Sequence, residues 1–278
     1  CSASAAHRWI NCPGSVALSD QCPDPGSSSY ADEGTVAHNL AELKLRHVLH
    51  EITDAQYKKR LAKIQQDDYY NGEMDEATDF YVETVLEEFA GEGAELMIEQ
   101  RLDLSQWIPE GFGTSDAVII GGSMIQVIDL KYGKGVKVEA KNNPQFRLYG
   151  LGAVSLFGDL YDFDTVKTTV VQPRLDHVDS EVVILKELLL WGEEEVAPRA
   201  IMAMEGSDYF VAGDWCRFCP AKARCRKRAE FNLDLARMEF QKPPLLSNEE
   251  IGEVLAKADH LKKWAEEVSE YALEQALA

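Results

Sequence analysis

The sequence predicts an α/β fold in which a mixed central sheet is flanked by helices. Between residues 31 and 93, apolar side chains recur at the three- and four-residue spacing of amphipathic helices. Between 94 and 131 this pattern gives way to short alternating runs, and a β-branched run follows at 164–172. Helical spacing returns between and after these runs. Such a succession of elements is typical of a layered α/β domain.

The N-terminal third is expected to be helical after an irregular start. Residues 1–29 contain a stretch rich in Pro and Gly and a run of three serines, so we expect loops there. The last helix of this third is acidic and amphipathic, and glycines at 91 and 93 end it. The expected helices span 31–51, 53–66 and 73–89.

The middle third is expected to form the sheet and one helix that covers it. Pro109-Glu110-Gly111 and Gly121-Gly122 read as turns, so the first three strands should form an antiparallel meander. A fourth strand should follow after the helix. The expected strands span 94–104, 111–120, 124–131 and 164–172, and the expected helix spans 143–157.

The C-terminal third is expected to be helical around a cysteine-bearing loop. Helices are expected at 180–204, 221–237 and 248–277, with the loop at 214–225. No internal repeat or linker marks a boundary, so we expect one domain over 1–278. Its parts would be a core at about 94–175, a helical insertion at about 31–93, a cysteine region formed by Cys12 and 214–228, and a C-terminal helix at about 248–277.

The composition is that of a soluble globular protein. Hydrophobic residues make up 45% and charged residues 27% of the chain, and no apolar run approaches the ~20 residues that span a bilayer. The formal net charge of −20 argues against a protein that coats nucleic acid non-specifically. The charge is uneven, however, because residues 67–99 hold twelve acids and no Lys or Arg, whereas 131–147 and 216–242 are basic.

Two aspartates and a lysine at the end of the predicted hairpin give the first signal for chemistry. Side chains alternate along a strand, so Asp129 and Lys131 share one face. Antiparallel counting from a turn near Gly121 places Asp116 beside Asp129. Two adjacent carboxylates repel each other unless a divalent cation lies between them. Mg²⁺ held there would polarise a phosphodiester and activate water, and Lys131 would stabilise the developing negative charge.

Four more polar residues are candidates for the same site. His38 lies in the first turns of the first long helix, and Glu99 lies on the first strand. Gln145 and Tyr149 are four residues apart, so they share one face of a helix. Taken alone, each of these residues is more typical of a solvated or partly buried position than of a functional site.

Cysteines give the second signal. Three of them are clustered as Cys216-x₂-Cys219-x₅-Cys225, and Cys12 would complete a four-thiolate site that ties both ends of the chain together. A disulfide framework is not expected, because the chain is long and shows no secretion signal. The spacing alone fits zinc as well as an iron–sulfur cluster, and Cys22 is the alternative to Cys12.

Taken in order, these motifs resemble the RecB-like branch of the PD-(D/E)xK nuclease superfamily. The resemblance is to its iron–sulfur form, which includes the AddB nuclease domain, the CRISPR adaptation nucleases and phage- or prophage-encoded nucleases. It runs from Cys12 to Cys225, and the proline of the family name is absent before Asp116. The motifs that carry it are Cys12, Gly34-Thr35-x-x-His38, Glu99, Gly113-Thr114-x-Asp116, Asp129-x-Lys131, Gln145-x₃-Tyr149 and the three C-terminal cysteines.

The resemblance implies a restriction-endonuclease-like core, with helical N- and C-terminal regions joined by the four-cysteine cluster. It also implies a role for each motif, with Lys131 as the catalytic lysine and the cluster as a structural clamp. The implied ligands of Mg²⁺ or Mn²⁺ are His38, Asp116, Asp129 and the Leu130 carbonyl. The implied catalytic residues are Asp116, Asp129, Lys131, Glu99, Gln145 and Tyr149. The implied ligands of a 4Fe–4S cluster are Cys12, Cys216, Cys219 and Cys225.

The activity implied by the resemblance is a metal-dependent deoxyribonuclease, in most relatives an exonuclease, acting on double-stranded DNA ends. A phage- or prophage-encoded enzyme of this kind would work in DNA recombination beside a single-strand annealing protein, in the cytoplasm of a bacterial host and away from membranes. No G-x-x-x-x-G-K-[ST] loop is present, so a helicase function is not expected. The basic residues expected to bind DNA are Lys134, Lys137, Lys141, Arg147, Arg224 and Arg226.

Two other functions fit part of the sequence. One is a catalytically silent nuclease fold that binds DNA ends as a recombination scaffold, although the complete Asp/Asp/Lys set argues against it. The other is a zinc-bound interaction module in which the aspartates and the lysine are surface pairs. The colour and metal content of the protein distinguish a zinc site from an iron–sulfur cluster.

Overall fold

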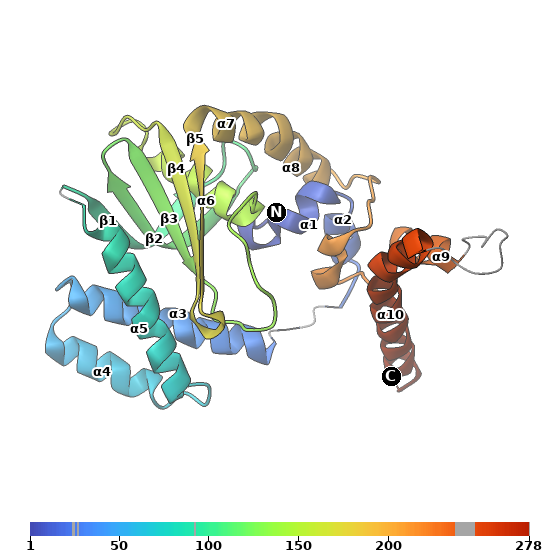
Figure 1. Ribbon diagram of the computed structural model, residues 1–278, viewed down its shortest axis with the longest axis horizontal. Coiled ribbons are helices and arrows are strands. Elements are labelled where there is room, and N and C mark those ends of the chain that lie inside the picture. The colour runs from blue at the N-terminus through green and yellow to red at the C-terminus, as the bar shows by residue number, and fades with distance from the viewer. Residues whose placement is uncertain (24–25, 27, 92, 237–247, 278) are drawn as a thin grey trace. The chain divides into compact units, whose positions relative to one another are not determined.

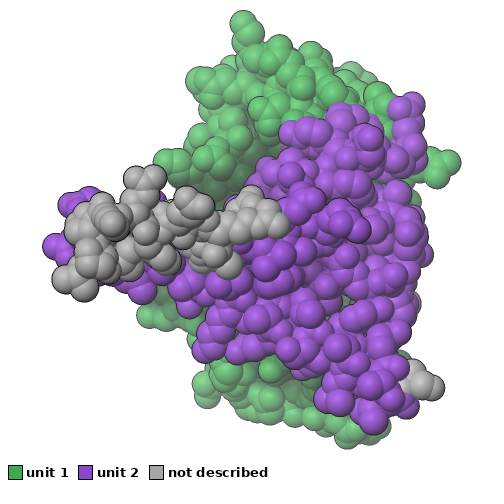
Figure 2. Space-filling view, turned by 90° about the vertical axis from the view of Figure 1, so that its right-hand side faces the viewer, with its two compact units in different colours: residues 1–7, 26–201 green, residues 8–25, 202–278 purple. Residues whose placement is uncertain are grey.

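The computed structural model describes residues 1–23, 26, 28–91, 93–236 and 248–277 (Figure 1). The chain divides into two compact units, which Figure 2 colours separately. The first unit comprises Cys1–His7 and Gly26–Ile201, and the second comprises Arg8–Pro25 and Met202–Ala278. The second unit therefore joins the segment around Cys12 to the C-terminal segment, while the predicted strands belong to the first unit.

The first unit is built on a mixed five-stranded sheet with strand order β1-β2-β3-β4-β5. β1, β2 and β3 form the predicted antiparallel meander, β4 runs parallel to β3, and β5 is antiparallel to β4. The parallel step requires a crossover, and α6 provides it. The strands span Glu95–Asp103 (β1), Phe112–Gly121 (β2), Met124–Leu130 (β3), Thr165–Gln172 (β4) and His177–Ile184 (β5).

Helices α3 to α6 of the first unit begin at side-chain caps that the sequence supplies. The Ser28 side chain accepts the amide of Ala31, Thr53 forms a capping box with Gln56, and Asn71 accepts the amide of Met74. Pro144 stands in the first turn of α6, where its missing N–H costs nothing. The helices span Ser29–Val48 (α3), Asp54–Ile64 (α4), Gly72–Phe89 (α5), Pro144–Phe157 (α6), Leu185–Trp191 (α7) and Ala197–Met204 (α8).

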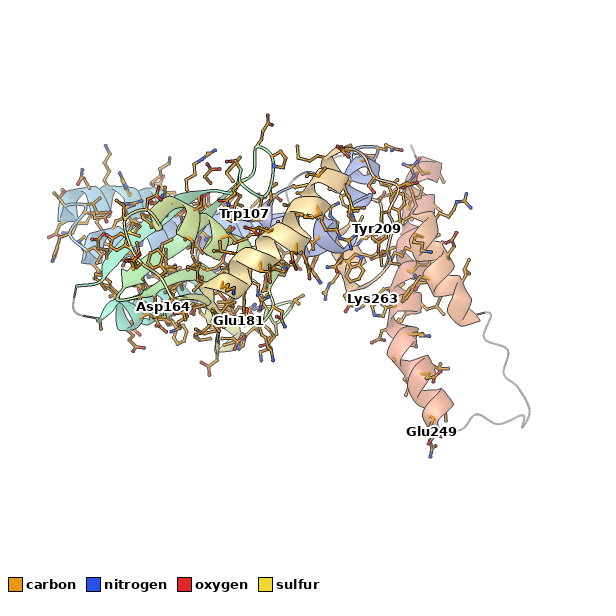
Figure 3. All side chains as sticks on the ribbon, turned by 90° about the horizontal axis from the view of Figure 1, so that it is seen from above. Trp107, Asp164, Glu181, Tyr209, Glu249 and Lys263 are labelled. Atoms are coloured by element: carbon orange, nitrogen blue, oxygen red, sulfur yellow. The ribbon has the colours of Figure 1, made fainter. Side chains whose placement is uncertain are left out.

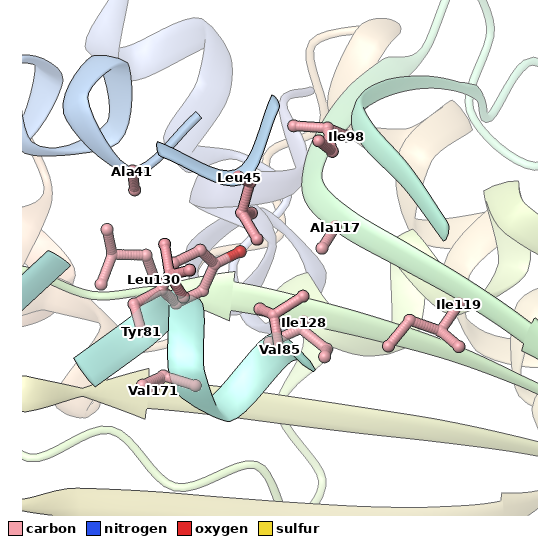
Figure 4. Packing of buried hydrophobic residues seen from close by; sticks show 11 residues of the cluster. Ala41, Leu45, Tyr81, Val85, Ile98, Ala117, Ile119, Ile128, Leu130 and Val171 are labelled. Carbon is pink, nitrogen blue, oxygen red and sulfur yellow. The ribbon is translucent and has the colours of Figure 1, made fainter. Parts of the chain in front are cut away.

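The main hydrophobic core lies between α3, α5 and one face of the sheet (Figure 4). Leu45 of α3 and Val85 of α5 pack there against Ile128 and Leu130 of β3, as the alternation along that strand predicts. α6 packs against the sheet as well, where Phe146 contacts Val170 of β4. Asp129 and Lys131 alternate with the core residues and lie on the α6 side, where Lys131 Nζ is 5.6 Å from the Phe146 ring centroid.

Two predictions about secondary structure were wrong. Residues 180–184 belong to β5 rather than to a long helix, because Asp176 takes a left-handed conformation (φ 46°) and turns the chain back along β4. Residues 1–29 are not wholly irregular, since they contain Ala3–Ala5, a 3-10 turn, and the helices Ala6–Asn11 (α1) and Ser15–Ser19 (α2). Elements this short have no periodicity that a sequence could display.

The second unit joins α2 to the C-terminal segment. Arg8 donates hydrogen bonds to Ser15 and Ser19, and the amide of Gly14 donates to the carbonyl of Tyr209. Side chains of this unit, Tyr209 and Lys263 among them, are drawn in Figure 3. Its other elements are the 3-10 helix Asp214–Phe218 (η4), Arg226–Ala236 (α9) and Asn248–Leu277 (α10). The predicted helix over 221–237 therefore begins later, and Arg237 lies outside the described residues.

Within the described part of the chain, no helix combines the length and apolar character needed to cross a membrane.

Candidate functional site

One cavity of about 460 Å³ in the first unit is lined by every motif that the sequence predicted for the metal site. Its walls come from α3, β1, β2, α6 and the end of β3. The predicted residues in its lining are His38, Glu99, Asp116, Asp129, Lys131, Gln145 and Tyr149. Thr114 of the Gly113-Thr114-x-Asp116 motif lines it as well, and so does Asn39, which no sequence motif marked.

The β2–β3 hairpin brings the two aspartates together. Gly121 pairs with Met124 and Ala117 pairs with Ile128, which fixes the register. Asp116 precedes Ala117 and Asp129 follows Ile128, so each aspartate is one residue further from the turn than this pair. The two aspartates therefore lie opposite each other on the two strands. The antiparallel counting made from the sequence is thus confirmed.

Asp116 is held by two contacts. Its Oδ1 is 2.8 Å from His38 Nδ1, and its Oδ2 accepts the amide N–H of Leu130 at 2.6 Å. Leu130 therefore contacts the site through its amide, and the role of its carbonyl as a metal ligand stays a prediction. Burial lowers the pKa of His38, but the carboxylates of Asp116 and Asp129 outweigh burial and raise that pKa to about 9. The site thus strongly favours a positive charge at His38.

Glu99 occupies a strained position on β1. The ladder between β1 and β2 pairs Ile98 with Ala117 and Gln100 with Ser115, and Glu99 between them has a φ of 52°. A left-handed conformation costs a non-glycine residue about 1 kcal/mol, and such residues concentrate at functional sites. Burial and the nearby Asp116 carboxylate raise the pKa of Glu99 to about 7.

Asp129 is the most buried acid of the site. It is 4% exposed, and its Oδ2 lies 2.6 Å from Lys131 Nζ. Among the described residues, that oxygen has no hydrogen-bond partner, so the contact is an ion pair without the alignment of a hydrogen bond. Burial raises the pKa of Asp129, and Lys131 opposes the rise. A buried carboxylate oxygen with spare lone pairs is a ready ligand for a cation.

Gln145 and Tyr149 form a pair on the α6 side of the cavity. Gln145 Nε2 donates to Tyr149 Oη at 3.0 Å. A Cβ on Gly113 would lie 2.7 Å from Tyr149 Cε1, so only glycine at this position leaves room for the tyrosine ring. This contact explains the glycine of the Gly113-Thr114-x-Asp116 motif. Burial raises the pKa of Tyr149 above its usual range, so the phenol stays protonated and can donate or accept.

The donor set fits a divalent cation. The ligand atoms of His38, Glu99 and Asp116 all lie within 4.8 Å of one another, and Asp129 lines the same cavity. Three carboxylates with one imidazole are the oxygen-rich donors that Mg²⁺ and Mn²⁺ prefer. Burial and the nearby charge of Asp116 raise the pKa values of Glu99 and Asp129. A cation bound between these carboxylates would reduce their repulsion.

A second group of possible donors does not point to a metal. The ligand atoms of Glu139, His177 and Asp179 also lie within 4.8 Å of one another. Asp179 accepts the amide of Ala140, His177 Nε2 donates to the carbonyl of Val138, and Glu139 pairs with Lys137. These contacts fasten the segment that follows β3 onto β5, which accounts for the grouping.

The residues predicted to bind DNA are engaged to different degrees. Lys134 lies 3.6 Å from Glu73 and Lys137 lies 3.0 Å from Glu139. Arg147 donates to both carboxylate oxygens of Glu181 on β5, and both side chains are largely buried. Lys141 and, in the second unit, Arg226 are exposed, while exposed Arg224 stacks on Tyr271. Arg147 therefore serves the fold, and the lysines remain candidates for phosphate contacts.

The four predicted cysteines line one cavity in the second unit. Cys12, Cys216, Cys219 and Cys225 share it with the cations Arg8, Lys222, Lys227 and Arg228. Cys22 is not in its lining, and its thiol donates to the carbonyl of Leu18 instead. Burial raises the pKa of Cys12 and of Cys216, so these thiols stay protonated at neutral pH unless a metal displaces the proton.

Comparisons with known proteins place the chain in a family. One solved structure, titled "Crystal structure of SSO0001", is 14% identical, with a TM-score of 0.31 over 68% of this chain and 84% of that chain. A likeness of that strength carries no conclusion about the fold or the site. A family model described as "Protein of unknown function (DUF2800)" matches residues 1–278. The chain therefore belongs to the DUF2800 family.

Proposed function

We propose that this protein is a metal-dependent DNA nuclease that acts at DNA ends. The observation that carries the proposal is the convergence of His38, Glu99, Asp116, Asp129 and Lys131 in one cavity. They come from α3, from two adjacent strands and from the end of a third. An acid pair beside a lysine, on adjacent inner strands of a mixed sheet, is the arrangement that the resemblance to RecB-like nucleases led us to expect.

Each residue has a distinct role in this proposal. His38, Asp116 and Asp129 would hold Mg²⁺ or Mn²⁺, with Glu99 beside them. The bound metal would polarise the scissile phosphate and lower the pKa of a water ligand. Lys131 would stabilise negative charge on the phosphate, since its ammonium lies at the site on the Asp129 carboxylate. Gln145 and Tyr149 would orient the substrate or water by hydrogen bonds from the opposite wall.

The second part of the proposal is a 4Fe–4S cluster held by the four cysteines of the second unit. Their shared cavity supports it. The four lining cations would offset the charge of four thiolates. The cluster would be structural, because it would fasten the segment around Cys12 to the C-terminal segment within one unit.

A nuclease assay tests the activity. Protein purified without oxygen is mixed with a linear duplex and with its covalently closed circular form, in Mg²⁺ or in EDTA. We expect metal-dependent loss of the linear form alone. Cleavage of both forms would keep the site and make the protein an endonuclease. No cleavage of either form, in protein that retains its cluster, would favour a silent DNA-end-binding scaffold.

Matched variants assign that activity to the site. Asp129→Asn and Lys131→Ala should each lower the cleavage rate at least about 100-fold, which corresponds to about 2.7 kcal/mol of transition-state stabilisation. Lys186→Ala removes an exposed lysine of α7 away from the cavity and serves as the control. Equal rates for Lys131→Ala and Lys186→Ala would overturn the assignment of the site.

A further inference from the structure

A second cavity adjoins the candidate metal site along α3. It has a volume of about 380 Å³ and is lined from α3 by Val36, Asn39, Glu42 and Leu43, and from the α4 side by Arg60, Lys63, Ile64 and Asp67. Asn39 and Glu42 also line the metal-site cavity. The two cavities therefore meet at these two side chains, and a groove leads from the acids of the site to the basic side chains of α4.

The cations of this groove are available to a ligand. Arg60 and Lys63 are three residues apart, so they lie on one side of α4, and both are exposed. Within the described ranges, neither side chain has an ion pair or a hydrogen bond, although most basic residues near the metal site do. Free cations at the mouth of an acidic site are suited to an anionic ligand.

The two acids of the groove are already engaged. Glu42 accepts a hydrogen bond from Arg46 Nε at 2.7 Å, and the Asp67 carboxylate accepts the amide of Tyr69 at 3.0 Å. The carboxylates of Glu42 and Asp67 therefore have partners of their own, which leaves the charges of Arg60 and Lys63 to a ligand. The sequence carries a signal for this patch in the basic run Lys58-Lys59-Arg60.

We propose that the groove between α3 and α4 binds the phosphate backbone of the DNA strand that enters or leaves the metal site. Arg60 and Lys63 would contact phosphates, and Asn39 would contact the strand where the two cavities meet. This inference rests on the proposed nuclease function, because that function places a DNA strand in the first cavity. It adds a binding surface on α4 to the lysines that follow β3.

Binding measurements test the groove independently of cleavage. In the Lys131→Ala background, a labelled duplex with a single-stranded overhang is titrated with protein carrying Arg60→Ala and Lys63→Ala. We expect affinity to fall about tenfold, and the slope of log K against log salt to fall by about 1.4, or about 0.7 for each phosphate contact on a single strand. The control carries Lys58→Ala and Lys59→Ala, which remove the same charge from exposed positions of α4 outside the groove lining.

Cleavage measurements separate failure of the groove from failure of the proposed function. For this measurement Lys131 is left unchanged. The protein carrying Arg60→Ala and Lys63→Ala should then cleave thymidine 5′-(p-nitrophenyl) phosphate at the rate of the wild-type protein, because this ester is too short to reach α4. On long DNA its KM should rise about tenfold with kcat kept. Equal losses in both double variants, or none in either, would overturn the groove. If the wild-type protein cleaves neither substrate, the proposed nuclease function is wrong. The binding titration would then still test whether the groove binds DNA.

Discussion

Glu99 lowers the stability of the metal-free protein at neutral pH. Its backbone is left-handed within a strand, and its carboxyl lies near Asp116 and His38. Its pKa is raised from 4.5 to about 7, so the folded state holds this proton more tightly than the unfolded state does. The contribution of Glu99 to stability is therefore present below about pH 4.5 and is lost as pH rises through about 7.

Glu99→Gln should remove this penalty. In EDTA at pH 8, we expect the variant to be more stable than the wild-type protein by about 1–2 kcal/mol, after allowance for the partial exposure of the site. At about pH 3 the two proteins should be equally stable, because Glu99 is then protonated in the folded and in the unfolded state. Chemical unfolding followed at both pH values measures the difference. In Mg²⁺ the order should reverse, and a variant that gains as much from Mg²⁺ as the wild-type protein would exclude Glu99 from the metal shell.

Lys131 has a structural role besides the chemical one. It is the counter-charge of the buried Asp129 carboxylate. Lys131→Ala should lower the free energy of unfolding in EDTA by about 2 kcal/mol, because it leaves a buried charge unpaired. Adding Asp129→Asn should restore most of that loss, since no charge then remains to be paired. A double-mutant cycle by urea unfolding measures the coupling, and additive losses would contradict it.

Among the elements, those with a strong local pattern were predictable and the others were not. β1 to β4 are apolar runs between turns, and α3 to α6 have apolar faces, so the sequence located them within a few residues. β5 is an edge strand that alternates between exposed and half-buried positions, and its Val-Val-Ile end merges with the leucines of α7. Its pairing with β4 depends on the turn at Asp176, which no local pattern marks.

The same distinction applies to the site. Asp116, Asp129 and Lys131 were predictable because one hairpin register places them together. The role of Arg147 was not, because its partner Glu181 lies on the strand that the sequence analysis missed (Figure 3). The groove of Arg60 and Lys63 depends on the packing of α4 against α3, a tertiary contact that the sequence pattern leaves open.

The pair of Arg147 and Glu181 ties α6 to β5, so Arg147→Ala should act on the fold. We expect it to lower the free energy of unfolding by about 2–3 kcal/mol, because it strands a largely buried carboxylate. Arg147→Ala with Glu181→Ala should recover part of that loss. Any weakening of DNA binding should follow the folded fraction. Full stability combined with a selective loss of DNA affinity would show that Arg147 contacts DNA after all.

For the whole molecule, the decisive feature is that the segment around Cys12 and the C-terminal segment form one unit. Cys12 accepts a hydrogen bond from the amide of Val211, 199 residues away, and both belong to the second unit. Closing so long a loop is entropically unfavourable, and a cluster bound by thiols from both segments would offset that cost. The first unit has its own sheet and core, so we expect its stability to be independent of the four cysteines of the second unit.

Cys12→Ser should therefore unfold the second unit selectively. We expect loss of the brown colour near ~400 nm, and hydrogen exchange more than about tenfold faster in α9 and η4, with β1 to β4 unchanged. Cys22→Ser, which alters a thiol outside the cavity of the four cysteines, should keep both the colour and the protection. Exchange measured by mass spectrometry on anaerobically purified protein compares the three forms.

Retained colour in Cys12→Ser with loss in Cys22→Ser would make Cys22 the fourth ligand. Unchanged protection in both variants would show that the second unit is held by packing alone.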